Sequence, residues 1–261
     1  MSSLGFGDNV LVEYDGHVAV VTINRPPHNH VTTVLLAHLA DAFENIDKID
    51  EIRASVLRTE GRSFCAGADL NEDDEVLGPI TGGINPLYAQ AVRLFRVRKP
   101  IVAAIQGAAV GAGLGLALVA DFRVAAREAR FVANFVSLGL HPGFGLTHTL
   151  PRLIGQQRAN LMFLTGRRMK AEEAKDYALV DQVTPLVTLR EAALSLAREI
   201  AANAPLAVAA TRATLRRELA AAVCAQTTWE DGEQKRLRLT EDFAEGIRAV
   251  KERRPGNFRG R

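Results

Sequence analysis

A glycine-rich turn between an apolar strand and an apolar helix places the strongest constraint on the fold of this chain. Residues 107–115 read GAAVGAGLG, with four glycines in nine positions, and they follow the apolar run IVAAI at 101–105. The residues after them, LALVAD, have helical character. Glycine lets a backbone turn tightly and approach a ligand closely, because it carries no side chain. The stretch therefore predicts a strand, a loop open to a ligand, and a helix.

The spacing of these glycines argues against a nucleotide-binding site. The exposed N–H groups of a helix N-terminus that follows a strand can bind phosphate. The dinucleotide fingerprint is Gly-x-Gly-x-x-Gly, whereas Gly111, Gly113 and Gly115 are spaced Gly-x-Gly-x-Gly. The Gly-Lys-Ser or Gly-Lys-Thr sequence of a P-loop is also absent. A nucleotide-dependent oxidoreductase is thus an alternative that the spacing disfavours.

A second turn of small residues suggests different chemistry. The stretch EGRSFCAGADL at 60–70 follows the strand-like run RASVLRT and contains Ala66, Gly67 and Ala68. Two such turns can point backbone N–H groups at one atom, and a pair of donors of this kind stabilises the oxyanion of an enolate or tetrahedral species. The alternative is that both are tight turns that pack a helix on a sheet.

Hydrophobic periodicity predicts alternating strands and helices over the first 145 residues. Asp15-Gly16 favours a two-residue hairpin turn between two apolar runs. The apolar positions from Leu36 to Ile46 are spaced for a helix, with Thr32 or Thr33 as its N-cap. Strands are expected at 53–59, 101–105, FRVAA and RFVAN, and a helix at 85–97. This alternation predicts the α/β class with parallel strand pairing.

From about residue 146 the pattern becomes helical. Apolar spacing predicts helices in THTLPRLIG, QRANLMFLTG, AEEAKDYAL, TLREAALSLAREIAA and the alanine-rich stretch 205–225. Thr188 and Glu191 form a capping-box pattern that predicts the start of one of these helices. A helical part therefore follows the α/β part.

Composition, charge and cysteine content favour a soluble cytoplasmic protein. Of the 261 residues, 48% are apolar and 24% are charged, and the net charge is only +2, which does not indicate a nucleic-acid or membrane partner. Cys65 and Cys224 match no metal or redox spacing, so a reducing, cytoplasmic location is expected. The N-terminus lacks signal-peptide features, and Gln106 with the glycines interrupts the apolar run at 101–120.

Two charged segments have less specific interpretations. The acidic cluster at 72–75 is expected to be a solvated face rather than a metal site, because its spacing does not form a ligand set. The basic tail IRAVKERRPGNFRGR is either a solvated charge run or a surface that meets an anion.

Several motifs, taken in order, resemble the crotonase superfamily, the enoyl-CoA hydratase/isomerase family. They are SFCAGADL at 63–70, KPIVAAIQGAAVGAGLGLALVADFRVAA at 99–126, LGLHPGFGLTHTLPRLIG and LTGRRMKAEEAKDYALVDQV, within a match that runs from VTINRPP to ERRPGNF. The resemblance implies a spiral of ββα units over residues 1–197 and a helical region over 198–261 that forms a homotrimer or a dimer of trimers. It also implies an acyl-CoA substrate, in which coenzyme A is part of the substrate and no separate cofactor or metal is needed.

The resemblance also implies the roles of particular residues. The backbone N–H groups of Ala68 and Ala112 would bind the thioester oxygen, and the family usually has glycine at the second of these positions. The remaining substrate contacts implied by motif position are His28, Ala66, Gly67, Asp69, Gly111, Gly115, Phe135 and Phe258. Among them, Phe258 belongs to the basic tail and would meet the nucleotide end of coenzyme A.

The two glutamates that hydratases of this family use are replaced here. The first matches Gly115 and the second matches Phe135, and neither residue can transfer a proton. The aspartate of members that form an aryl adduct matches Gly143. His141 is the nearby candidate acid or base, since an unperturbed imidazole titrates near pH 6.5, although it could instead bind backbone in its Pro/Gly turn.

The sequence therefore predicts an enoyl-CoA hydratase/isomerase-like enzyme that stabilises a thioester enolate and in which classical hydration is compromised. The alternatives are a non-catalytic acyl-CoA-binding protein and a thioester hydrolase that uses His141.

Overall fold

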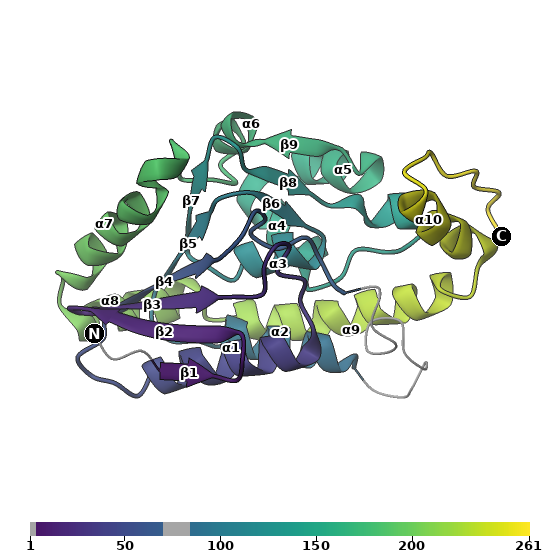
Figure 1. Ribbon diagram of the computed structural model, residues 1–261. Coiled ribbons are helices and arrows are strands. Elements are labelled where there is room, and N and C mark those ends of the chain that lie inside the picture. The colour runs from purple at the N-terminus through teal and green to yellow at the C-terminus, as the bar shows by residue number, and fades with distance from the viewer. Residues whose placement is uncertain (1–3, 70–83) are drawn as a thin grey trace.

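The computed structural model describes residues 4–69 and 84–261, and the acidic cluster at 72–75 lies outside this part of the chain. A main sheet has the strand order β1-β2-β3-β4-β5-β7-β10, and a smaller sheet has the order β6-β8-β9 (Figure 1). The strands are β1 (Leu4–Phe6), β2 (Val10–Asp15), β3 (Val18–Ile23), β4 (Ala54–Thr59), β5 (Ile101–Ile105), β6 (Ala108–Val110), β7 (Phe122–Ala126), β8 (Arg130–Val132), β9 (Arg168–Lys170) and β10 (Gln182–Thr184).

The main sheet begins with antiparallel pairs and continues with parallel ones. Strands β1, β2 and β3 pair antiparallel, and Gly16 has the positive φ that the β2–β3 hairpin turn needs. From β3 through β4, β5 and β7 to β10 each pair is parallel. The predicted hairpin and the predicted parallel α/β core are confirmed.

Helices cover both faces of this sheet and extend beyond it. They are α1 (Thr33–Ile46), α2 (Pro86–Phe95), α3 (Ala112–Ala117), α4 (Leu146–Ile154), α5 (Gln156–Thr165), α6 (Ala171–Asp176), α7 (Leu189–Ala201), α8 (Pro205–Leu215), α9 (Leu219–Leu237) and α10 (Glu241–Lys251), with short 3-10 turns η1 (Asn134–Leu138) and η2 (Leu186–Thr188). Alternate residues of the strands divide the core into two clusters. On β4, Val56 packs in the cluster with α7, whereas Leu57 packs in the larger cluster with α1, α2 and α3.

The predicted start of α7 is confirmed, but the predicted capping contact is wrong. Thr188 is the N-cap residue, yet its backbone is helical and its side chain caps no N–H group of the helix. Its hydroxyl bonds the Pro185 carbonyl and the Thr184 hydroxyl, and Glu191 pairs with Arg198. The 3-10 turn before α7 thus competes for the threonine side chain.

The C-terminal helices fold back onto the same chain. Figure 1 shows α9 running alongside α2, and α9 also packs against α4 while α10 packs against η1. The predicted helical region is confirmed, and the expected boundary at 197/198 falls inside α7. In the described ranges 4–69 and 84–261, no helix is long and apolar enough to cross a membrane.

Candidate active site

A short parallel bridge holds the two small-residue loops together. Cys65 pairs with Ala109: the Cys65 N–H donates to the Ala108 carbonyl, and the Val110 N–H donates to the Cys65 carbonyl, both at 3.0 Å. Ala68 and Ala112 each lie three residues beyond this bridge. The pairing therefore brings the two predicted donors to the same end of the two loops.

The local backbone leaves the N–H groups of Ala68 and Ala112 outside the regular hydrogen-bond ladders. Val31 donates to the Gly67 carbonyl at 2.9 Å and accepts from Asp69 at 3.1 Å, so the Ala68 N–H points away from Val31. Ala112 is the first residue of α3, and first-turn N–H groups have no partner within a helix. Both groups are available to an acceptor.

Two glycines allow this close approach of the loops. A Cβ atom on Gly113 would lie 2.1 Å from the Cys65 carbonyl oxygen, which excludes every other residue type without backbone movement. Gly67 has φ +105°, and a Cβ there would lie 3.2 Å from the Val110 oxygen.

Ala68 and Ala112 line one pocket of about 330 Å³, in the lower part of the size range of small-molecule sites. Its other lining residues are His30, Ala66, Gly67, Asn85, Leu87, Tyr88, Val110, Gly111, Asn134, Phe135, Leu138, Leu140, Gln234, Ile247, Val250 and Lys251. Of the described residues that line it, none is an aspartate or a glutamate. A larger groove of about 780 Å³ lies between α4 and α8 and contains none of the predicted site residues.

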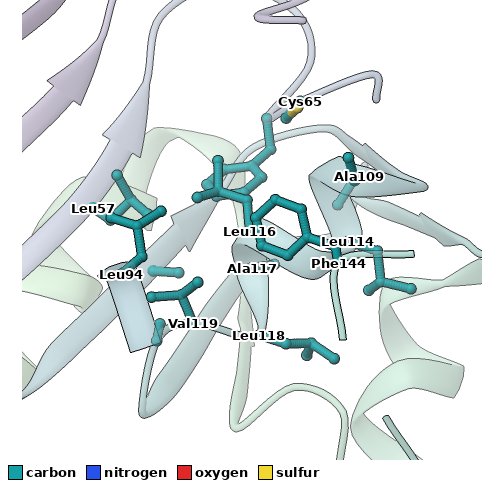
Figure 2. Close-up of a cluster of buried hydrophobic side chains, with 14 of the residues drawn as sticks. Leu57, Cys65, Leu94, Ala109, Leu114, Leu116, Ala117, Leu118, Val119 and Phe144 are labelled. Atoms are coloured by element: carbon teal, nitrogen blue, oxygen red, sulfur yellow. The ribbon is translucent and has the colours of Figure 1, made fainter. Parts of the chain in front are cut away.

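The space beside Gly115 is filled by an aromatic ring. A Cβ atom on Gly115 would lie 2.5 Å from Phe144 Cδ1, and Phe144 is completely buried. Figure 2 shows Phe144 within a cluster of apolar side chains that includes Leu114 and Leu116. Position 115 therefore faces the hydrophobic core, and Gly115 is not among the residues that line the pocket.

Phe135 lies in the pocket beside one of the two donor loops. Its Cζ atom is 3.6 Å from the place of a Cβ on Gly111, the residue before Ala112. Phe135 is buried and forms part of η1. An aromatic ring therefore lies beside Gly115, and an aromatic ring occupies position 135, the two positions predicted to replace catalytic glutamates.

A buried polar pair crosses the apolar wall of the pocket. The Tyr88 hydroxyl on α2 donates to Gln234 Oε1 on α9 at 2.7 Å, and Gln234 Nε2 donates to the His141 carbonyl at 2.8 Å. A Cβ on Gly143 would lie 2.0 Å from the Tyr88 hydroxyl, so this pair fills the space beside Gly143. Tyr88 and Gln234 are not among the residues predicted from the sequence, because no local pattern relates positions 146 residues apart.

The structure separates some of the other predicted residues from the pocket. His141 Nδ1 donates to the Pro142 carbonyl at 2.7 Å, and His141 is not among the lining residues. Asp69 pairs with Arg25 at 3.0 Å, and His28 shares a 3.4 Å hydrogen bond with the Ser63 hydroxyl. The His28 ring contacts the ring of His30, which does line the pocket.

The basic tail is bound to α10 of its own chain. Arg254 pairs with Glu245, Arg261 pairs with Glu241 at 3.0 Å, and Asp242 accepts from the N–H groups of residues 259 and 260. Phe258 is 43% exposed and lies outside the residues that line the pocket. The described part of the chain contains no group of His, Cys, Asp and Glu side chains that could hold a metal ion.

Comparisons with known proteins agree with this arrangement. The family model described as enoyl-CoA hydratase/isomerase matches residues 13–261. The chain is 36% identical to the 2,3-dehydroadipyl-CoA hydratase of Escherichia coli over 254 residues, covering 97% of this chain and 99% of that protein. It is 33% identical to the 1,2-epoxyphenylacetyl-CoA isomerase of the same organism over 258 residues, with 97% and 98% covered.

Solved structures give the same result. The enoyl-CoA hydratase/isomerase of Pseudoalteromonas atlantica superimposes with a TM-score of 0.87 and 31% identity, covering 97% of this chain and all of the other. An enoyl-CoA hydratase of Mycobacterium avium gives a TM-score of 0.83 at 28% identity, with 97% and 99% covered. These matches confirm the crotonase-like architecture that the motifs predict. The chain therefore belongs to the enoyl-CoA hydratase/isomerase family.

Proposed function

We propose that this protein binds an acyl-CoA and stabilises a thioester enolate between the N–H groups of Ala68 and Ala112. The observation that carries the proposal is that these two donors, which have no partner among the described residues, belong to residues that line one pocket and come from loops joined by the Cys65–Ala109 bridge. In the reaction a base removes a proton from Cα, and the electron pair moves onto the thioester oxygen. The two donors stabilise the negative charge that forms there.

The named relatives support a thioester substrate more than any single reaction. One is named as a hydratase of 2,3-dehydroadipyl-CoA and another as an isomerase of 1,2-epoxyphenylacetyl-CoA. Their acyl groups and reactions differ, whereas the CoA thioester is common to both names. The thioester carbonyl is the group that two backbone donors would recognise.

Ordinary hydration of an enoyl-CoA is not part of the proposal. Hydration requires groups that activate water and protonate Cα, and Gly115 and Phe135 supply neither. Three titratable side chains line the described pocket, namely His30, Tyr88 and Lys251. His30 Nδ1 is buried without a hydrogen-bond partner in the described part of the chain, which makes His30 the first base to test.

A non-catalytic acyl-CoA-binding protein is the second candidate. It is favoured by the absence of Asp and Glu from the described lining and by the Phe144 ring that fills the space beside Gly115. Such a protein would bind the thioester and leave its Cα protons in place. The proposed thioester hydrolysis through His141 requires this side chain to turn toward the pocket from its bond to Pro142.

Deuterium exchange distinguishes these functions. Purified protein is incubated with butyryl-CoA in D₂O, and the mass of the acyl group is followed. Enolate formation predicts deuterium at Cα in the wild type and a loss of exchange in His30→Gln. Binding measured by calorimetry without exchange would support the second candidate, and hydrolysis lost only in His141→Ala would support the third.

Two further tests address hydration and assembly. Rapid loss of the enoyl absorbance of crotonyl-CoA would contradict the proposal that hydration is absent.

We also propose a homotrimer or a dimer of trimers in the cytoplasm, without a cofactor beyond the coenzyme A of the substrate. Light scattering of the purified chain measures the assembly.

A further inference from the structure

Tyr88 and Gln234 form a polar pair inside a pocket wall that is otherwise mostly apolar. Tyr88 is 4% exposed and Gln234 is 6% exposed, and both residues line the pocket. The apolar neighbours in this wall include Leu87, Leu138 and Leu140. Buried polar groups reduce stability unless they are hydrogen-bonded, and these two side chains are bonded to each other.

The hydrogen-bond network determines how the Gln234 amide is oriented. Its Nε2 atom donates to the His141 carbonyl at 2.8 Å, and its Oε1 atom accepts from the Tyr88 hydroxyl at 2.7 Å. The reversed amide would place two carbonyl oxygens against each other, so this orientation is fixed.

The pair retains capacity for further hydrogen bonds after these two have formed. A tyrosine hydroxyl that donates its proton still accepts through its oxygen, and a primary amide has two N–H donors. Among the described residues no further partner is found for these groups, so one Nε2 hydrogen of Gln234 and the oxygen of Tyr88 are left to bond another group. Together they offer one donor and one acceptor to a group in the pocket.

From these contacts we infer that Tyr88 and Gln234 select an acyl group that carries a hydroxyl over an aliphatic group of the same size. A hydroxyl both donates and accepts, so it can satisfy the two remaining valences of the pair. An aliphatic chain would exclude water from these two groups without forming hydrogen bonds to them. A site that binds a hydroxyl through hydrogen bonds therefore rejects the analogue that lacks the hydroxyl. The inference rests on the proposed binding of acyl-CoA in this pocket.

The surroundings of Tyr88 keep its hydroxyl protonated. Burial is the largest cause of a raised pKa at Tyr88, and Glu230 and Asp231 raise this pKa further. Their effect on Tyr88 exceeds that of the nearby Arg238. The hydroxyl therefore donates to Gln234 and keeps its oxygen as an acceptor.

Isosteric thioesters test the selection. Calorimetry compares 3-hydroxybutyryl-CoA with isovaleryl-CoA, and 6-hydroxyhexanoyl-CoA with heptanoyl-CoA, pairs in which a hydroxyl replaces a methyl group. We expect the wild type to bind the hydroxyl member of at least one pair roughly tenfold more tightly, as expected for two neutral hydrogen bonds. Equal binding within both pairs overturns this inference and leaves the proposed function intact. Absence of binding to all four thioesters overturns both.

Two variants and a matched control assign the preference to the pair. Tyr88→Phe alone leaves Gln234 Oε1 buried without its donor, so the double variant Tyr88→Phe/Gln234→Leu is measured as well. Both variants should lose the preference for the hydroxyl thioester and should still bind the aliphatic thioesters. Tyr177→Phe is the control, because Tyr177 stacks with Arg158 and lies outside the pocket lining. A preference that survives in the double variant overturns the inference, as does tighter binding of glutaryl-CoA than of either hydroxyl thioester.

Discussion

The loops that carry the two predicted donors differ in their surroundings from the two positions predicted to replace catalytic glutamates. The loops that end at Ala68 and Ala112 have small residues and close backbone contacts, and both residues line the pocket. Beside Gly115, by contrast, the Phe144 ring fills the space, and Phe135 lines the pocket with an aromatic ring of its own.

This difference separates two parts of the chemistry that a hydratase combines. Stabilising an oxyanion needs only fixed dipoles, which the backbone supplies whatever the side chains are. Moving protons needs particular side chains with space around them. Under the proposed function, the backbone of the two loops meets the first requirement, whereas the Phe144 ring leaves no space for an acid beside Gly115.

The largest expected effect comes from restoring an acid at position 115. Gly115→Glu places a Cβ 2.5 Å from the buried Phe144 ring and a carboxylate in the hydrophobic core. Overpacking and an unpaired buried charge should together lower the free energy of unfolding by about 3–5 kcal/mol, measured by urea denaturation.

A solvent-exposed glycine serves as the control for the Gly115→Glu substitution. A Cβ on Gly232 in α9 meets no atom within 4 Å, and the residue is exposed. Gly232→Glu should therefore leave the stability within about 1 kcal/mol of the wild type. A Gly115→Glu variant as stable as Gly232→Glu would show that the core beside Phe144 can rearrange to accommodate a glutamate.

The donor loops are tested by removing one N–H group. Ala112 is the first residue of α3, a position where proline fits a helix without loss of an internal hydrogen bond. Ala112→Pro should lower the rate of Cα deuterium exchange about 100- to 1000-fold, the usual effect of losing one oxyanion donor. Ala112→Gly keeps the N–H and should change the rate much less. Equal rates in the two variants would exclude Ala112 as a donor.

Local patterns predicted the parts of the fold whose cause is local. The strands at 101–105 and 122–126 are observed with the predicted limits, since each is a short apolar run ended by a turn or a charged residue. The hairpin followed from Asp15-Gly16 and its flanking periodicity. At α7 the start was predicted correctly from Thr188, although the hydroxyl bonds the preceding turn instead of the helix.

Local sequence patterns could not predict the tertiary contacts of the site. Two examples are the Phe144 ring beside Gly115 and the hydrogen bond from Tyr88 to Gln234, because both depend on how separate helices and loops pack. His30 is close in sequence to the predicted contact His28 and was expected to border the same loop, whereas its place in the pocket depends on the pairing of Val31 with Ala68. The positions of the donors followed from motif resemblance, whereas the identity of the pocket's polar groups required the fold.

The pH dependence of stability should also differ between the donor loops and the aromatic side, although its effect is smaller than that of Gly115→Glu. On the donor side, burial raises the pKa of Cys65 to about 12, so this thiol stays neutral at ordinary pH. Behind the aromatic side, Glu230 accepts hydrogen bonds from the Gly145 and Thr147 N–H groups, next to Phe144. Burial nevertheless raises the pKa of Glu230 to about 7.

A raised carboxyl pKa makes the folded state bind a proton more tightly than the unfolded chain, whose glutamates titrate near 4.5. The stability contributed by Glu230 is therefore present below pH 4.5 and is lost as the pH rises through 7, by about 3 kcal/mol in total. Urea denaturation at pH 5 and pH 8 measures this loss, and Glu230→Gln, which cannot titrate, should remove it from the difference between the two pH values. An unchanged difference in Glu230→Gln would mean that other groups cause the pH dependence. The hydrogen bonds from Gly145 and Thr147 favour the ionised carboxylate, so they should persist at pH 8, and the loss of stability should come from the buried charge rather than from local opening. Amide hydrogen exchange at residues 145–147 should therefore rise with pH no faster than exchange at 65 and 110, after correction for the intrinsic rate; a selective rise at 145–147 would contradict this account.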